Sequence, residues 1–238
     1  MTTPNDSLDF YPTPDSLAFD MVFSLREVKS GFTTYPKPIL EPSAGDGALA
    51  RQVHALAFNV HHDYKTGEVD QYDKGKARNA ELDCIELSSD FRAVLKKDGF
   101  RVVHDNFLTF RPTTKYAAIV MNPPFSEGAR HLLKALDIMQ DGGKIRCLLN
   151  AETIRNPYTN ERKTLAAELE RLNAQVEYIP DAFKNARRRG GGACVGGHSR
   201  PGAGEPDPPG SEKRNRRALE RKPGVCRPGI FRPHHGSH

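Results

Sequence analysis

Asn122-Pro123-Pro124-Phe125 is the pattern in this chain with the clearest chemical meaning, and it directly follows the apolar residues 119–121. The apolar run predicts a buried strand, and the two prolines restrict the backbone of the loop that follows it. The side-chain oxygen of Asn122 and the carbonyl oxygen of Pro123 can each accept one hydrogen from an NH₂ group. Phe125 can stack on a flat ring that carries this group. The pattern indicates chemistry on the amine of a planar substrate; a proline turn beside a surface phenylalanine is the alternative.

A second pattern, Gly45-Asp46-Gly47-Ala48-Leu49-Ala50, has the form G-x-G-x-x-A at a predicted strand-to-helix turn. Such a turn lets a nucleotide-like ligand approach the backbone, because glycine carries no side chain to block it. Glu41 ends the preceding strand, where it can accept hydrogen bonds from a cationic amine. Ser43 and Asp46 complete the candidate binding residues of this loop. A tight structural turn is the alternative.

Acidic residues follow two further predicted strands. Glu86 can accept from both hydroxyls of a ribose, although it lies 41 positions after Gly45 instead of the roughly 20 typical of a compact unit. A polar insertion at 59–80 accounts for the difference. Asp105 can accept from the amine of an adenine while Phe107 packs on its face. A solvated strand end and an ordinary Asp-Asn turn are the alternatives.

The elements that must position these residues alternate along the chain. Apolar runs predict strands at 38–42, 82–87, 100–104, 116–121, 144–150 and 175–179. Helical spacing predicts helices at 15–29, 48–56, 89–97, 127–139 and 161–173. This alternation predicts an α/β fold, a Rossmann-like, doubly wound and mostly parallel sheet with helices on both faces.

In this order, the glycine loop and Asn122-Pro123-Pro124-Phe125 resemble the cofactor and catalytic motifs of class I S-adenosylmethionine-dependent methyltransferases. The resemblance is closest to DNA adenine-N6 enzymes, including those of phages and prophages. Phe10-Tyr11-Pro12-Thr13-Pro14 is similar to the segment that these enzymes place over the methionine end of the cofactor. The resemblance implies S-adenosyl-L-methionine as cofactor, direct transfer without a metal, and catalysis by residues 122–125. The cofactor-binding residues that it implies are Tyr11, Thr13, Glu41, Ser43, Gly45, Asp46, Gly47, Glu86, Asp105, Phe107 and Asn122.

The substrate that the resemblance implies is the exocyclic amine of a nucleic-acid base, with adenine N6 in DNA favoured over RNA. A base in duplex DNA would have to be flipped out of the helix, with Phe125 as a stacking surface. Tyr158, in the loop Asn156-Pro157-Tyr158-Thr159, is a second candidate, but a plain turn is the favoured interpretation there. The alternatives are methylation of a ribosomal-RNA base, methylation of a protein glutamine, for which tyrosine usually replaces Phe125, and an inactive remnant. Cytosine-C5 methylation is excluded because it needs a cysteine after a proline, and the chain has no Pro-Cys pair.

The charge of the chain is unevenly distributed. The net charge is +5, but residues 187–238 hold 12 Lys and Arg against 4 Asp and Glu. The rest of the chain keeps 23 basic and 26 acidic residues, a net charge of −3. The basic character therefore belongs to the tail and does not show that the folded domain binds a polyanion.

The same tail contains 11 Gly, 7 Pro and 10 Arg, a composition that cannot form a core. We predict a methyltransferase domain at 1–186 and a disordered tail at 187–238. An out-of-frame reading of a GC-rich gene is the favoured origin of the tail, and a natural basic tail is the alternative. The antiparallel final strand of the family should follow Phe183-Lys184-Asn185-Ala186, so we expect it to be missing.

Cysteine content and hydropathy complete the expectations. The four cysteines are widely spaced and include no C-x-x-C pair, so neither disulfides nor a metal site is predicted. The chain has no apolar run of membrane-spanning length and no leader pattern, which predicts a cytoplasmic location.

Overall fold

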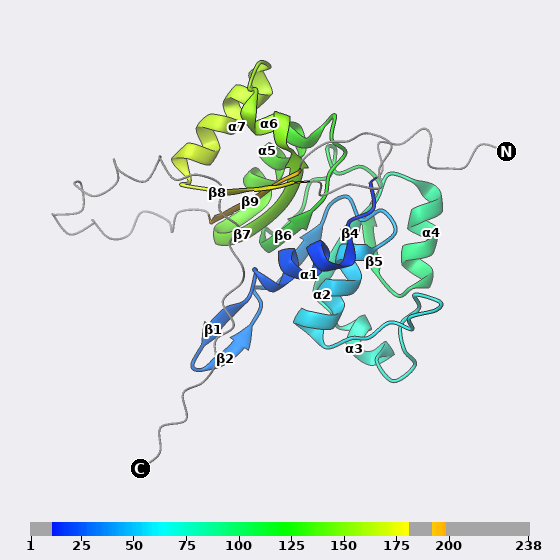
Figure 1. Ribbon diagram of the computed structural model, residues 1–238. Coiled ribbons are helices and arrows are strands. Elements are labelled where there is room, and N and C mark those ends of the chain that lie inside the picture. The colour runs from blue at the N-terminus through cyan, green and yellow to red at the C-terminus, as the bar shows by residue number, and fades with distance from the viewer. Residues whose placement is uncertain (1–10, 181–191, 199–238) are drawn as a thin grey trace, which may run out of the picture. The chain divides into compact units, whose positions relative to one another are not determined.

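The computed structural model describes residues 11–180 and 192–198, which are organised around one seven-stranded sheet (Figure 1). The strand order is β5-β4-β3-β6-β7-β9-β8. Five strands run parallel to one another: β3 (Ile39–Glu41), β4 (Leu82–Ile85), β5 (Arg101–His104), β6 (Tyr116–Met121) and β7 (Met139–Asn150). Strand β9 (Gly192–His198) is antiparallel to β7 and to β8 (Gln175–Ile179). The predicted α/β fold with a mostly parallel sheet is confirmed.

Two hydrophobic cores lie on opposite faces of the sheet. Ala118 and Val120 of β6 belong to the core that contains buried residues of α1 (Asp15–Phe23), α2 (Ala48–Phe58) and α4 (Ser89–Lys97). Ile119 and Met121 belong to the core under α5 (Gly128–Ile138) and α7 (Asn160–Arg171). This alternation is what a strand covered by helices on both faces requires. None of the helices described is both long and apolar enough to cross a membrane.

The strand order places a crevice beside β3. This strand pairs with β4 on one side and with β6 on the other. The chain first extends the sheet on the β4 side of β3 and later continues it on the β6 side, so the strand order reverses at β3. In open α/β sheets, ligands bind outside the carboxyl ends of the strands at such a switch point. The loops after β3 and β6 therefore meet there, and these loops carry the two main sequence motifs.

Strand β9 corrects the expectation that the final strand would be missing. It pairs along its whole length with residues 144–150 of β7 and with all of β8. The glycines that suggested disorder fit this place, because a Cβ at Gly196 would lie 2.5 Å from Nη1 of Arg146. Small residues let the strand enter between two partners that both need backbone hydrogen bonds. Residues 187–191 and 199–238, the rest of the predicted tail, lie outside the described residues.

The first helix is shorter than predicted. It ends at Phe23, and the residues expected to complete it form a hairpin of β1 (Glu27–Lys29) and β2 (Phe32–Thr34). The two residues of the turn, Ser30 and Gly31, have φ values of 51° and 80°. Two positive φ values in succession are typical of the tight turns that join antiparallel strands. Local turn geometry thus prevails over the helical spacing of the apolar residues.

The predicted insertion lies between α2 and β4 and is anchored by histidines. It contains the short helix α3 (Lys74–Arg78). A second short helix, α6 (Ala151–Arg155), lies outside the insertion and follows β7. Nδ1 of His54 lies 2.9 Å from Nε2 of His62, and both rings pack on Phe100. Burial, followed by the neighbouring His62, lowers the pKa of His54 to about 3.

This histidine pair predicts acid sensitivity. The unfolded chain binds a proton at His54 below about pH 6.5, whereas the folded chain does not, so the free energy of unfolding should fall as the pH decreases. Between pH 7.5 and 5.5 we expect His54 to contribute a loss of about 1 kcal/mol. Urea denaturation at the two pH values measures this loss. His54→Gln should reduce the pH dependence; equal pH dependence in wild type and His54→Gln would contradict the prediction.

Candidate active site

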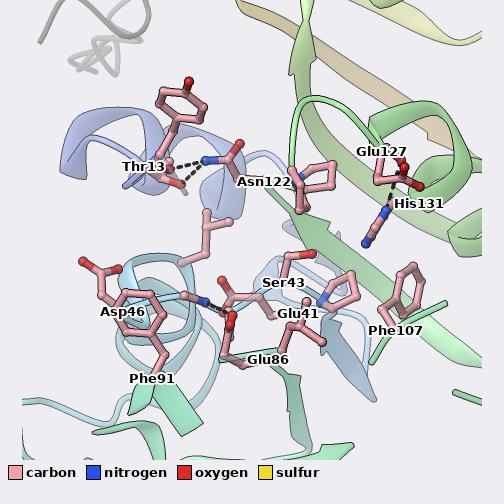
Figure 2. Close-up of a pocket in the computed structure, with 18 of the residues that line it drawn as sticks. Thr13, Glu41, Ser43, Asp46, Glu86, Phe91, Phe107, Asn122, Glu127 and His131 are labelled. Atoms are coloured by element: carbon pink, nitrogen blue, oxygen red, sulfur yellow. Dashed lines mark hydrogen bonds between the residues drawn. The ribbon is translucent and has the colours of Figure 1, made fainter. Parts of the chain in front are cut away.

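A pocket lies at the carboxyl ends of β3, β4, β5 and β6, where the predicted crevice is expected (Figure 2). Four loops and the segment before α1 contribute to its wall. The sequence-predicted residues that line it are Tyr11, Thr13, Glu41, Ser43, Gly45, Asp46, Glu86, Asp105, Phe107, Asn122, Pro123 and Pro124. The structure thus brings together residues that are more than 100 positions apart in the sequence.

The glycine loop is held against β4 by backbone hydrogen bonds. The Ala44 N–H donates to the carbonyl of Ile85 at 3.0 Å, and the Gly45 N–H donates to Oε2 of Glu86 at 2.7 Å. The other Glu86 oxygen accepts from the Ser88 N–H at 2.7 Å. Glu86 therefore joins two loops, a role that its position at a strand end did not reveal. A carboxylate has about four acceptor sites, so it can still accept from a ligand hydroxyl.

Gly47 differs from the sequence-based interpretation, because it does not line the pocket. Its φ is 86°, and a Cβ there would lie 3.0 Å from Leu95 and 3.4 Å from Phe100. The missing side chain therefore makes room for the packing of the loop on α4 and β5. Gly45, with φ 53°, is the glycine that faces the pocket.

Glu41 is a buried carboxyl group at the end of β3. Its side chain is 1% exposed, and its Oε2 has no hydrogen-bond partner among the described residues. Burial, followed by the nearby carboxylate of Asp46, raises the pKa of Glu41 well above its usual range. An isolated acceptor of this kind is costly in a folded protein unless a ligand pairs with it. The site therefore fits a ligand that carries a cationic N–H donor.

Asn122 is held in one orientation by the segment before α1 (Figure 2). Its Nδ2 donates to the carbonyl of Tyr11 at 2.9 Å and to Oγ1 of Thr13 at 3.0 Å. A backbone carbonyl only accepts, so the nitrogen of the amide must face Tyr11. The amide oxygen Oδ1 is then left buried, without a hydrogen-bond partner among the described residues.

The aromatic residues near Asn122 form a pair. The rings of Tyr11 and Phe125 stack with their centroids 4.7 Å apart and their planes at 15°. Phe125 does not line the pocket itself, whereas Pro123 and Pro124 do. Tyr158, the second predicted stacking residue, is 65% exposed and packs beneath the guanidinium of Arg162. The structure does not bring Tyr158 to the pocket wall.

Solved structures with the same architecture share this chain's fold. A modification subunit of a putative type I restriction enzyme from Vibrio vulnificus aligns with a TM-score of 0.58 and 16% identity, over 83% of this chain and 46% of that one. A putative class I S-adenosylmethionine-dependent methyltransferase from Listeria monocytogenes aligns with a TM-score of 0.53 and 12% identity, over 87% of this chain and 65% of that one. The 23S rRNA methyltransferase ErmE aligns with a TM-score of 0.52 and 15% identity, over 81% of this chain and 71% of that one. The chain has the methyltransferase fold.

The similarity is limited to structure. No protein-family model matches the sequence, and no curated protein does. The chain spans about half the length of the restriction-enzyme subunit that it resembles. The common feature is thus the arrangement of sheet and helices.

The pocket-lining residues that sequence reasoning missed include Phe91, Glu127 and His131. Glu127 and His131 stand four positions apart at the start of α5, directly after the proline loop. This spacing places both on one helical face, which is the feature that could have identified them. Asp105, by contrast, is a predicted residue that lies only at the edge of the pocket. Its side chain is 64% exposed, and its Oδ1 lies 3.2 Å from Nδ1 of His104.

Proposed function

We propose that this protein is an S-adenosylmethionine-dependent methyltransferase that acts on the exocyclic amine of a nucleic-acid base. The observation that carries the proposal is Asn122, whose Nδ2 is fully engaged while its buried Oδ1 has no partner in the described chain. An acceptor held in this way is suited to a substrate N–H. It lies in the same pocket as Glu41, the second acceptor without a partner.

The residues around Glu41 fit the cofactor. The methionine part of S-adenosylmethionine carries an ammonium group, which can donate to the free Oε2 of Glu41. Gly45 leaves its backbone accessible, and Glu86 can accept from ribose hydroxyls in addition to its two backbone donors. When bound, the cofactor supplies an electrophilic methyl group on a sulfonium. Tyr11, Thr13, Ser43, Asp46, Asp105 and Phe107 complete the proposed binding site.

The chain prepares the substrate amine by hydrogen bonding. Oδ1 of Asn122 accepts one hydrogen and the carbonyl of Pro123 accepts the other, which makes the nitrogen lone pair available for attack. The two prolines keep the loop from rearranging, and the bonds to Tyr11 and Thr13 keep the amide from rotating. Catalysis of this kind depends on positioning and on oriented dipoles.

The aromatic pair supports a base as the substrate. Phe125, which stacks on Tyr11 and directly follows Asn122-Pro123-Pro124, is the proposed stacking residue, and a base stacked on an aromatic residue gains roughly 1–3 kcal/mol. We favour adenine N6 in DNA, in keeping with the resemblance of the motifs and with the similarity to a restriction-enzyme modification subunit. Residues 187–238 carry a net charge of +8 and would add salt-sensitive contacts to the nucleic acid.

Product analysis tests the substrate class. The protein is incubated with tritium-labelled S-adenosylmethionine and, separately, with DNA, ribosomal RNA and an unfolded protein mixture. We expect label in DNA, recovered after digestion as N6-methyl-2′-deoxyadenosine. Label in RNA or in glutamine would replace the DNA assignment, and no label in any substrate would contradict the enzymatic function.

Cofactor binding is tested by Gly45→Leu. A leucine at a pocket-facing position with φ 53° both strains the backbone and fills ligand space, so we expect affinity for S-adenosylhomocysteine to fall by at least about 30-fold. Calorimetry on both proteins measures the change. Gly75→Leu is the matched control, because a Cβ at Gly75 meets no atom within 4 Å. Equal affinity in wild type and Gly45→Leu would remove the binding site from this loop.

A further inference from the structure

His131 is a buried side chain that the proposed chemistry does not use. It lies at the start of α5 with 8% of its surface exposed, and it lines the pocket. Its Nδ1 is 3.0 Å from the carbonyl oxygen of Glu127. Figure 2 shows its second ring nitrogen pointing away from Glu127 and toward the pocket.

The hydrogen bond to Glu127 determines which nitrogen of His131 carries the proton. A carbonyl oxygen only accepts, so Nδ1 must be the N–H donor. Burial lowers the pKa of His131, and the nearby cations Arg130 and Lys134 lower it further, whereas the hydrogen bond to Glu127 and the charge of that residue act in the opposite direction. The ring is therefore neutral at pH 7, and its Nε2 presents a lone pair to the pocket.

An aromatic ring lies next to His131 in the pocket wall. The ring of Phe107, 3% exposed, has its centroid 5.5 Å from that of His131. Leu108 and Pro124 also line the pocket, and the side chain of Asp105, 64% exposed, lies at its edge. A pocket wall that combines an aromatic ring with an inward-facing acceptor suits a flat heteroaromatic ring that carries an N–H donor on its rim.

We infer that Nε2 of His131 accepts a hydrogen bond from the amine of the cofactor's adenine. The inference rests on the proposed function, in which Asp105 accepts from the same amine; the amine has two hydrogens, so each acceptor can take one. Phe107 then packs against the ring, and His131 serves as a binding residue that distinguishes adenine from purines without an amine. Phe107 follows β5 and Asn122 follows β6, so the adenine end lies across the pocket from the substrate amine.

The test combines a change in the protein with a change in the ligand. Calorimetry compares S-adenosylhomocysteine with its analogue in which purine replaces adenine and the amine is absent. His131→Asn retains an amide nitrogen near the Nδ1 position but loses the acceptor at Nε2. His131→Gln can place an amide oxygen near the Nε2 position and is the matched control. Both ligands are measured without substrate, so a base of the nucleic acid cannot account for the result.

Wild type should prefer the adenine ligand, and His131→Asn should reduce this preference by about 3- to 10-fold, the effect of one hydrogen bond. His131→Gln should keep most of it. A preference in His131→Asn equal to that of wild type, or no preference in wild type, would overturn the inference while leaving cofactor binding in place. If wild type binds neither ligand, the proposed function itself fails, and the inference falls with it.

Discussion

Asn122→Ala should reduce the rate of methyl transfer by at least about 100- to 1,000-fold, the usual cost of removing one oriented hydrogen-bond partner of the reacting group. The amide of Asn122 has its donors engaged by Tyr11 and Thr13, so its only remaining capacity is the buried Oδ1. Removal of this acceptor leaves the amine unoriented. Affinity for S-adenosylhomocysteine should stay nearly unchanged, because Glu41 and the glycine loop remain.

Thr13 provides a graded companion to this experiment. Thr13→Val keeps the size of the side chain but removes the acceptor for Nδ2, so we expect a smaller loss of rate, about 10-fold, since Tyr11 still holds the amide. Thr13→Ser retains the hydroxyl and should recover most of the rate. Single-turnover kinetics with saturating cofactor measure all three variants. Normal turnover in Asn122→Ala would mean that the amine is held elsewhere.

Glu41→Gln should weaken the binding of S-adenosylhomocysteine by about 10- to 100-fold, because a hydrogen bond to a charged group is worth about 1.5–3 kcal/mol. The variant keeps the shape of the side chain and removes its charge. It should also unfold at a higher temperature near neutral pH without ligand. The folded-state pKa of Glu41 is raised, so its contribution to stability is lost as the pH rises, and glutamine has no such loss.

The same carboxyl group links binding to pH. Burial favours the protonated form of Glu41 in the free protein, whereas the ammonium group of the ligand favours the ionised form. Binding should therefore release a proton, and affinity should increase with pH until the free carboxyl is ionised. Calorimetry in two buffers with different ionisation enthalpies counts this proton. Glu41→Gln should abolish the release; an unchanged release would assign the proton to another group.

The sequence by itself determined the order of elements and the chemistry of the motifs. Apolar runs at strand spacing and helical segments between them are local patterns, and five of the six predicted strands recur within a residue or two of their predicted ends. The sixth, β7, begins earlier, at Met139. Because parallel strands direct their carboxyl ends to one edge, the pattern also predicts that Glu41, Glu86 and Asn122 meet in one pocket, as they do.

Only the tertiary structure decided how these groups are engaged. Asn122 is oriented by residues 109 and 111 positions away, and Glu86 holds Gly45 from a distance of 41 positions. His131 faces the pocket because α5 packs against β6 and β7 in the hydrophobic core, which turns this residue toward the pocket. Strand β9 forms because β7 and β8 leave a gap that a glycine-rich segment can enter over Arg146. Local composition does not predict such contacts, because their free energy depends on partners that only folding brings together.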